Sequence, residues 1–209
     1  MARVRKRLPP DERRRVIEEA AAPLFAEHGF AATRLDDVAT AAGVTKPVLY
    51  RHFASKKELY LALLAKHRAL LPRFAEPVAT DEPFLTHLPK LLDAWFAYVQ
   101  DQPYAWYLIF RDTTGDPEIQ AFREDVQAAA RRVLAELIRP QPDLMIPEQE
   151  LEPLAELLRS AMVGLTLWWL DHPDVPRSTI VDLVTRVWRG LLEPRRARRR
   201  VGSARPTAC

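Results

Sequence analysis

The sequence that decides the fold lies between residues 33 and 53 and reads Thr33-Arg34-Leu35-Asp36-Asp37-Val38-Ala39-Thr40-Ala41-Ala42-Gly43-Val44-Thr45-Lys46-Pro47-Val48-Leu49-Tyr50-Arg51-His52-Phe53. Gly43 separates two short segments of helical apolar spacing, and a tight turn between two helices needs a residue that tolerates a positive φ. Thr33 and Thr45 stand at N-cap positions, and Asp36 follows Thr33 at the spacing of a capping box. The stretch therefore predicts helices over 34–42 and 46–53, joined as a helix-turn-helix.

A helix on each side completes this unit. Residues 11–28 carry a stripe of apolar side chains at helical spacing, with Gly29 as a natural helix end, and Pro23 is expected to bend this helix without ending it. On the other side, Ser55-Lys56-Lys57-Glu58 is a capping box that opens a longer helix, which should connect this unit to the rest of the chain. The expected small core consists of Val38, Val44, Leu49 and Phe53 with Leu24, Phe25 and Phe30.

The rest of the chain keeps apolar spacings of three and four residues and shows no strand-like alternation. Prolines and other helix ends delimit five further helices, at 84–100, 103–111, 117–139, 147–170 and 177–193, after a linker at 75–83. The fold class is therefore all-α, with an N-terminal three-helix helix-turn-helix domain and a larger helical body. Four parts are expected: a basic flexible arm at 1–9, the helix-turn-helix at 10–54, the body at 55–194 and a disordered basic tail at 195–209.

Charge is distributed unevenly along the chain. Residues 1–60 hold 12 basic and 8 acidic side chains, residues 61–194 hold 13 and 20, and residues 195–209 hold 6 and none. A basic head on an acidic body is typical of a phosphate-binding module attached to one that does not touch DNA, and a solvated charged face is the alternative interpretation. The lack of a secretory signal and of an apolar run of about 18 residues predicts a cytoplasmic protein, and a lone cysteine excludes a disulfide framework and a thiolate metal cluster.

Motifs of the common enzyme classes were sought as a rival interpretation. The sequence contains no HExxH, Walker or GxSxG pattern. Asp171-His172-Pro173-Asp174 is a compact cluster of acids and a histidine, but a loop that ends a helix explains it more simply. We therefore expect no catalytic site, no cofactor and no metal.

The second helix of a helix-turn-helix presents its first residues to base edges in the major groove. Lys46 is suited to guanine O6 and N7, and Pro47 or Val48 to a thymine methyl group. Contacts to the sugar-phosphate backbone are expected from Thr33, Arg34, Thr45, Tyr50, His52 and Lys56. Basic arms can enter the minor groove, so the arm candidates are Arg3, Arg5, Lys6 and Arg7. The alternatives are a structural His52, a core Tyr50 and an arm that only aids solubility.

The head resembles the DNA-binding domain of TetR-family regulators from Asp11 to about Leu64. The resemblance is carried by the pattern Thr33-x4-Val38-Ala39-x3-Gly43-Val44-x5-Tyr50-x-His52-Phe53-x2-Lys56-x2-Leu59. It implies a transcriptional repressor that binds a palindromic operator as a homodimer, with a body that binds a small effector and dimerises through the last two long helices, about 147–170 and 177–193. The rival is an architectural DNA-binding protein without an effector, against which the large aromatic body argues.

Aromatic residues in the body supply material for the effector pocket that this resemblance implies. The pocket candidates are Trp95, Tyr98, Trp106, Tyr107, Phe110, Arg111, Phe122, Met162, Leu165 and Trp169. At helical spacing such residues are also expected in an ordinary core, and Arg111 with Asp112 is the expected polar fixture. Residues 162–171, with Trp188-x-Gly190-Leu191, are similar to actinobacterial members that govern lipid metabolism, which implies an apolar effector such as a fatty acyl chain or an acyl thioester.

Overall fold

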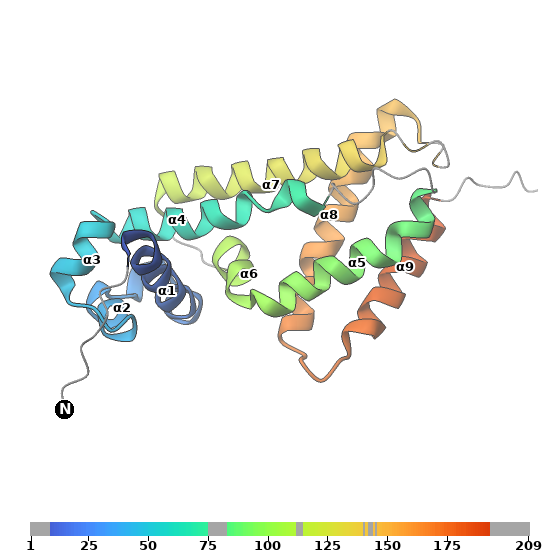
Figure 1. The fold of residues 1–209 in the computed structure, drawn as a ribbon. Coiled ribbons are helices and arrows are strands. Elements are labelled where there is room, and N and C mark those ends of the chain that lie inside the picture. Colours follow the sequence, from blue (N-terminus) through green and yellow to red (C-terminus); the bar gives the residue numbers. More distant parts are fainter. Residues whose placement is uncertain are drawn as a thin grey trace, which may run out of the picture.

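The computed structural model describes residues 9–74, 83–111, 115–139, 141, 144 and 146–192. Every regular element in these residues is a helix and none is a strand, which confirms the all-α prediction. Three short or kinked helices form a head at one end of the molecule, and the remaining helices form an elongated body (Figure 1). The predicted arm at 1–9, the linker at 75–83 and the tail at 195–209 fall almost entirely outside the described residues.

Three helices make the head: α1 (Pro10–Ala32), α2 (Leu35–Ala41) and α3 (Lys46–His52). The α1 backbone leaves helical geometry at Gly29, with φ of 75° and ψ of 170°, whereas Pro23 keeps helical angles inside the same helix. Such a backbone conformation is open essentially to glycine alone. The chain therefore turns at Gly29, as expected for the end of the first helix, and α2 crosses beneath it.

Helix α4 (Lys56–Arg68) leads out of the head and runs beside α7 (Pro117–Ile138), as Figure 1 shows. The Ser55 hydroxyl accepts a hydrogen bond from the Glu58 N–H at 3.0 Å, as the capping box predicts. The return bond differs by one residue, because the Glu58 carboxylate accepts from the Ala54 N–H at 2.7 Å. The cap thus fixes where the connecting helix begins.

The body contains the short 3-10 helix η1 (Leu71–Phe74), α5 (Phe84–Asp101), α6 (Pro103–Phe110), α7, α8 (Glu148–Leu170) and α9 (Arg177–Leu192). These bounds agree closely with the predicted helices. Prolines open α6 and α7, where a missing backbone N–H costs no helical hydrogen bond. In the described part of the chain, no helix is both long and apolar enough to cross a membrane.

Two clusters of buried apolar side chains hold the fold together. One fills the body between α5, α8 and α9. The other contains the head core, with Phe25, Val38, Leu49 and Phe53 at 0 or 1% exposure, and it extends without a break into α6 and α7. Four of the seven predicted head-core residues are therefore buried, and the other three, Leu24, Phe30 and Val44, are partly buried and pack against them. The core is closed by body residues as well as by head residues. This continuity links the position of the head to the packing of the body.

Candidate nucleic-acid interface and effector cavity

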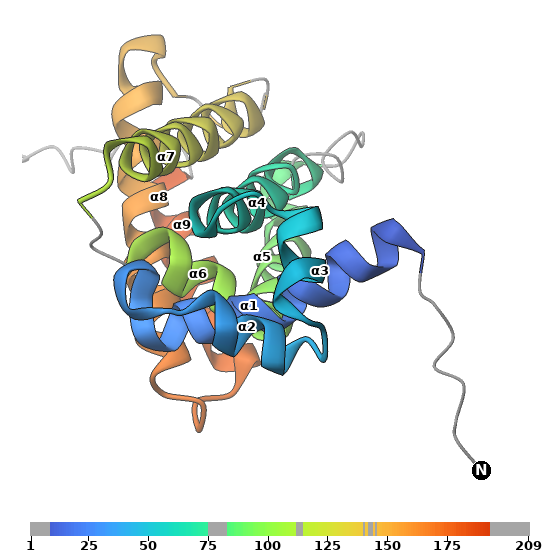
Figure 2. The same ribbon diagram turned by 90° about the vertical axis from the view of Figure 1, so that its left-hand side faces the viewer.

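The turn between α2 and α3 is built around Gly43, which has φ of 62°. The Gly43 N–H donates to the Thr40 carbonyl at 3.0 Å, and the Val44 N–H donates to the Ala39 carbonyl at 2.9 Å. A residue with a Cβ would pay about 1–2 kcal/mol in this left-handed conformation. The glycine therefore permits the change of direction that carries α3 to the outer end of the head (Figure 2).

Helix α3 buries a single side chain, Leu49, and leaves its first turn at the surface. Lys46 and Pro47 are exposed, Val48 is half-buried and Tyr50 is 45% exposed, which argues against a core role for Tyr50. Thr45 is the N-cap residue by its backbone angles, although its hydroxyl makes no capping hydrogen bond. The predicted base-reading residues thus share one open side of the head.

An ion pair already occupies Lys46. Its ammonium lies 2.9 Å from Oδ1 and 3.2 Å from Oδ2 of Asp36 on α2. The hydrogen bond to Lys46 lowers the pKa of Asp36, and the same bond raises the pKa of Lys46. Both side chains are about half exposed, so solvent screens the pair and a stronger anion can displace the carboxylate.

Two predicted phosphate contacts are engaged inside the head instead. Thr33 is only 3% exposed, and its hydroxyl donates to the carbonyls of Gly29 at 2.7 Å and Leu24 at 3.1 Å. The prediction that Thr33 caps the second helix is therefore wrong: Arg34 is the N-cap residue of α2, and it makes no side-chain capping bond. Because the Thr33 hydroxyl faces the protein, it is withdrawn from the proposed DNA contacts.

Lys56 fastens the start of α4 to the end of α1. Its ammonium donates to the carbonyls of Ala31 and Thr33, both at 3.0 Å, and lies 4.7 Å from the centre of the Phe30 ring. An ammonium has three N–H donors, so one is left for a phosphate. Lys56 acts first as a tie within the head, and a DNA contact from it stays a prediction.

Sequence reasoning missed Arg14, which holds the end of α3. Its guanidinium donates to the His52 carbonyl at 2.8 Å and lies 4.1 Å from the centre of the Phe53 ring. The contact fixes the backbone of His52 and leaves its imidazole half-buried. Arg34 is exposed, as a phosphate contact requires, and the arm residues 3–7 lie outside the described residues.

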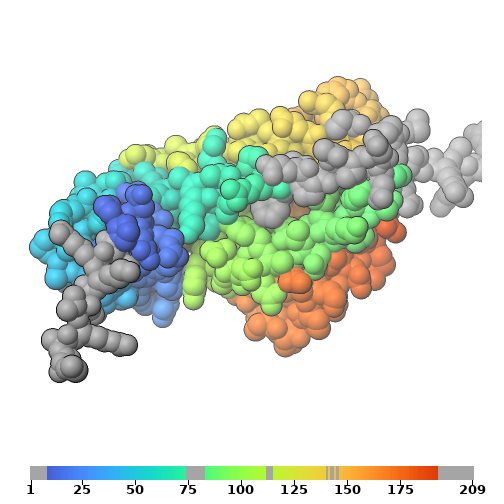
Figure 3. All heavy atoms as spheres, viewed as in Figure 1, coloured from blue at the N-terminus to red at the C-terminus, as the bar shows by residue number. Residues whose placement is uncertain are grey.

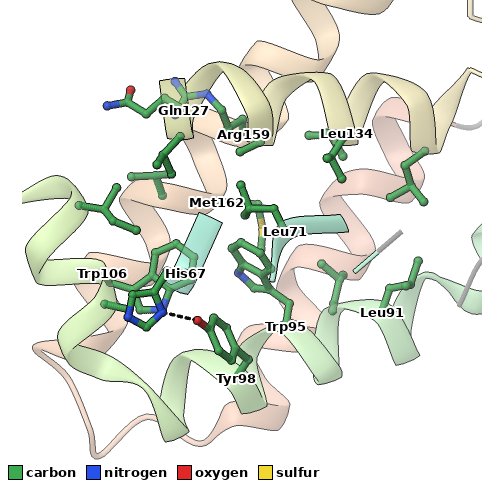
Figure 4. Close-up of a pocket in the computed structure, with 18 of the residues that line it drawn as sticks. His67, Leu71, Leu91, Trp95, Tyr98, Trp106, Gln127, Leu134, Arg159 and Met162 are labelled. Carbon is green, nitrogen blue, oxygen red and sulfur yellow. Dashed lines mark hydrogen bonds between the residues drawn. The ribbon is translucent and has the colours of Figure 1, made fainter. Parts of the chain in front are cut away.

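The body encloses a cavity of about 140 Å³ between α4, α5, α6, α7, α8 and α9. Its wall is almost wholly apolar (Figure 4). The lining residues are His67, Leu71, Phe84, Leu88, Leu91, Leu92, Trp95, Tyr98, Ala105, Trp106, Ile109, Phe110, Val126, Gln127, Ala130, Val133, Leu134, Leu137, Arg159, Met162, Val163 and Trp188. An apolar hollow with a few polar groups has the character of a small-molecule site.

Five of the ten pocket candidates line this cavity: Trp95, Tyr98, Trp106, Phe110 and Met162. Their aromatic rings pack against one another, with centroids 4.9 Å apart for Trp95 and Trp106 and 5.9 Å apart for Trp106 and Phe110. Together α5 and α6 therefore form an aromatic wall. The residues that line it recur along one side of each helix.

The other five candidates lie elsewhere. Arg111 pairs with Asp171 and lies 4.6 Å from the ring centre of Tyr107, so both form an exposed clasp between α6 and the end of α8. Arg111 is thus not a polar fixture of the cavity, and Asp112 falls outside the described residues. Phe122 and Leu165 pack against the two apolar clusters. Trp169 is buried, with its indole N–H donating to the Val175 carbonyl at 2.8 Å.

A polar pair in the cavity wall was not predicted. His67 is 8% exposed, and its Nδ1 lies 2.6 Å from the Tyr98 hydroxyl. Burial lowers the pKa of His67 to about 4 and raises the pKa of Tyr98 to about 12, so both are uncharged at neutral pH. A signal was available, because Tyr60, Leu63, Leu64 and His67 continue one buried stripe of α4. The basic neighbours Lys66 and Arg68 made His67 look like part of an exposed charged turn.

The folded chain is expected to lose stability as the pH falls from 6.5 toward 4. Because burial lowers the pKa of His67 from 6.5 to about 4, the unfolded chain binds a proton in this window that the folded chain does not. The contribution of neutral His67 to the free energy of unfolding is complete above pH 6.5. Below that pH it declines with a slope of up to about 1.4 kcal/mol per pH unit. Urea denaturation at stepped pH measures it. His67→Gln should flatten the slope, whereas replacing the exposed His28 with glutamine should not; equal slopes would contradict the assignment.

A buried hydrogen-bond network joins the head to the cavity wall. Arg123 on α7 is 8% exposed and donates to the Tyr60 hydroxyl at 2.8 Å and the Leu108 carbonyl at 3.0 Å. The Tyr60 hydroxyl also donates to the Leu108 carbonyl at 3.0 Å, and the Tyr60 ring meets Phe25 edge to face at 5.0 Å. Helices α4, α6 and α7 therefore share one polar joint, and α1 packs against it through the Phe25 ring. Ile109, the residue after Leu108, lines the cavity.

Comparison with known proteins gives consistent matches. The sequence family described as "Bacterial regulatory proteins, tetR family" matches residues 17–63, which span most of the head and the start of α4. The chain is 32% identical over 189 residues to the HTH-type transcriptional activator FasR of Mycolicibacterium smegmatis, which covers 88% of this chain and 85% of FasR.

Solved structures show the same fold. A TetR-like transcriptional regulator from Rhodococcus sp. RHA1 has a TM-score of 0.72 at 25% identity, covering 88% of this chain and 98% of that one. The transcriptional regulator FadR from Bacillus subtilis, in complex with stearoyl-CoA, has a TM-score of 0.65 at 13% identity, covering 83% and 96%. At 13% identity the likeness concerns the fold alone.

Proposed function

Because the chain belongs to the TetR family of bacterial transcriptional regulators, we propose that it binds a palindromic operator as a homodimer and is released from it by an apolar small molecule. Its relatives are regulators and not enzymes. The observation that carries the proposal is that two cavity-lining residues, Ile109 and Val126, belong to the same buried cluster as the head core. A ligand that moves either residue must repack the head. We place the regulator in the cytoplasm, where its DNA lies.

DNA reading is assigned to the open side of α3. Lys46 would donate to guanine, Pro47 and Val48 would contact a thymine methyl group, and Tyr50 would reach a phosphate. Lys46, Pro47 and Tyr50 are exposed and Val48 is half-buried, which supports the assignment. Thr45, Arg34, His52 and the third donor of Lys56 complete the proposed backbone contacts.

Asp36→Asn is expected to tighten operator binding, because it frees the Lys46 ammonium from its internal partner. Asp37→Asn is the matched control: it removes the same charge from the same turn of α2, where no ion pair with Lys46 exists among the described residues. Both variants remove a negative charge that repels DNA. The gain in operator affinity should be roughly threefold larger for Asp36→Asn than for Asp37→Asn. Fluorescence anisotropy with a labelled operator measures the difference. Equal gains would mean that the ion pair does not limit Lys46.

The proposed effector is an apolar molecule of the fatty acyl or acyl-thioester kind. The cavity is lined almost entirely by aliphatic and aromatic side chains, which favours a hydrocarbon chain. FadR, which shares the fold, was solved with stearoyl-CoA. The presence of the cavity also argues against an architectural DNA-binding protein, which needs no hollow in its body.

Dimerisation is assigned to the outer faces of α8 and α9. Seven large apolar side chains are exposed in the described residues, and five of them lie on these two helices. They are Leu157, Trp168, Leu183, Val187 and Leu191. Figure 3 shows α9 at the lower edge of the body, away from the head. A two-fold axis through this face would place two copies of α3 on one side of a duplex, about 34–36 Å apart.

The chain is a repressor if it blocks transcription while it is bound to the operator, and a ligand that releases it then restores transcription. FasR carries the name of an activator, so the sign of regulation follows from where the operator lies relative to the promoter. We propose repression. A reporter driven by the promoter next to the chain's own gene should rise when that gene is deleted, and a fall would assign activation instead.

Footprinting on DNA that flanks the chain's own gene tests the binding proposal. The parent should protect a palindrome, and Lys46→Ala with Tyr50→Ala should bind it at least tenfold more weakly, since each contact is worth about 1–3 kcal/mol. The matched control is Lys90→Ala with Tyr104→Ala, an exposed lysine and a 44% exposed tyrosine of the body. Equal binding by the α3 variant would refute the assignment. Stearoyl-CoA, added to the parent complex, should release the DNA.

A further inference from the structure

An ion pair joins the two helices of the helix-turn-helix across the turn between them. Asp36 lies in the first turn of α2, and Lys46 is the first residue of α3. Both carboxylate oxygens of Asp36 approach the Lys46 ammonium, at 2.9 and 3.2 Å. Each helix is anchored by buried side chains, Val38 on α2 and Leu49 on α3. The backbone therefore holds the carboxylate and the ammonium close together before any DNA binds.

The ion pair leaves Lys46 able to read a guanine. An ammonium carries three N–H donors, and the Asp36 carboxylate engages only part of them. Guanine O6 and N7 are uncharged acceptors, so they can accept from Lys46 while the carboxylate stays in place. A base contact from Lys46 is thus compatible with the ion pair.

A phosphate, in contrast, competes with Asp36 for the same charge. The carboxylate repels the anionic oxygens, so Lys46 must exchange one anion for another to bind them. Side chains of Lys46 and Asp36 are 54% and 49% exposed, so an approaching duplex meets both. Binding to DNA of arbitrary sequence depends on phosphate contacts. Lys46 therefore adds little to that binding as long as Asp36 holds it.

We infer that Asp36 is a specificity-determining residue: by holding Lys46, it weakens binding to DNA of arbitrary sequence more than it weakens binding to the operator. A genome offers about 10⁶–10⁹ competing non-specific sites, so even a severalfold loss of non-specific affinity favours occupation of the operator. The inference rests on the proposed function, in which Lys46 reads a guanine. It deepens that function by assigning part of the selectivity to an acidic residue that need not contact a base.

Anisotropy titrations with two labelled duplexes test the inference: the palindrome protected in footprinting, and a scrambled duplex of the same length and composition. Asp36→Asn should raise the affinity for the scrambled duplex at least threefold more than the affinity for the palindrome. The salt dependence of the scrambled complex should steepen by about 0.9 in log K per unit of log salt concentration, because the freed Lys46 neutralises one more phosphate. The palindrome complex should keep its slope.

Three further variants isolate the ion pair from the general effect of charge. Asp37→Asn removes an exposed carboxylate from the same turn of α2 and should raise both affinities by the same factor. Asp36→Glu keeps a carboxylate beside Lys46 and should preserve the selectivity of the parent. When Lys46 is replaced by alanine, adding Asp36→Asn should no longer change the ratio of the two affinities, since no ammonium is left to free.

The outcomes separate the inference from the function on which it rests. If Asp36→Asn leaves the ratio of the two affinities unchanged, or changes it equally when Lys46 is alanine, the role of Asp36 in selectivity is overturned and operator binding stands. If the parent does not distinguish the two duplexes, the proposed operator binding itself fails. Urea denaturation of each variant verifies that it folds, as expected for substitutions at exposed positions.

Discussion

Val187→Asp is expected to convert the regulator into monomers and to lower its operator affinity at least a hundredfold. Val187 is 51% exposed at the middle of the apolar face of α9. Two-fold symmetry would place the new carboxylate in the interface twice, and burying each costs several kcal/mol. A monomer holds one half-site only, and loss of bivalent binding commonly costs a factor of roughly 10² to 10⁴.

Light scattering on a sizing column measures the molar mass, and anisotropy with a full and a half operator measures the affinity. Ser178→Asp is the matched control, since it adds the same charge to an exposed polar position of the same helix. That variant should remain dimeric and bind like the parent. A Val187→Asp protein that stays dimeric would place the interface elsewhere, and the exposed apolar face of α8 and α9 would then need another partner.

Local features of the head were predictable because they depend on neighbours in sequence. Gly43, the Ser55 cap and the helix bounds follow from backbone geometry that a few adjacent residues determine. Lys56 was misjudged for the opposite reason, because its partner Ala31 is 25 residues away and is reached only when α4 has packed against α1. Thr33 was misjudged although its partner is local: its hydroxyl donates back to the carbonyl of Gly29, four residues earlier, and not forward into α2.

The cavity shows where periodicity stops being informative. It identifies a buried side of a helix but does not say whether that side meets another side chain or a hollow. Trp95 and Trp169 satisfy the same apolar pattern, and only packing places Trp95 in the cavity wall and Trp169 against Phe96. Tyr107 lies in α6 and Arg111 directly follows it; this helix is apolar nearly all round, so sequence alone could not identify its outward side.

Arg123→Ala is expected to destabilise the chain by about 2–4 kcal/mol. The substitution removes two charge-assisted hydrogen bonds from a buried site and leaves the volume of a long side chain unfilled. Urea denaturation measures the loss. Arg132→Ala is the control on the same helix: its side chain is 53% exposed and its pair with Asp125 spans 3.9 Å, so it should change stability by less than about 0.5 kcal/mol.

Arg123→Met separates the joint's role in coupling from its role in stability. Methionine fills most of the arginine's volume without its donors, and the Tyr60 hydroxyl can still donate to the Leu108 carbonyl. If the joint transmits ligand binding from α6 to the head, this variant should bind the operator like the parent and respond to stearoyl-CoA with at least a fivefold smaller loss of DNA affinity. A full ligand response in a folded Arg123→Met protein would show that apolar contacts at Ile109 and Val126 carry the coupling alone. Coupling is the difference between the free energies of DNA binding with and without ligand. A smaller ligand response is therefore distinct from a simple loss of ligand affinity, which calorimetry detects separately.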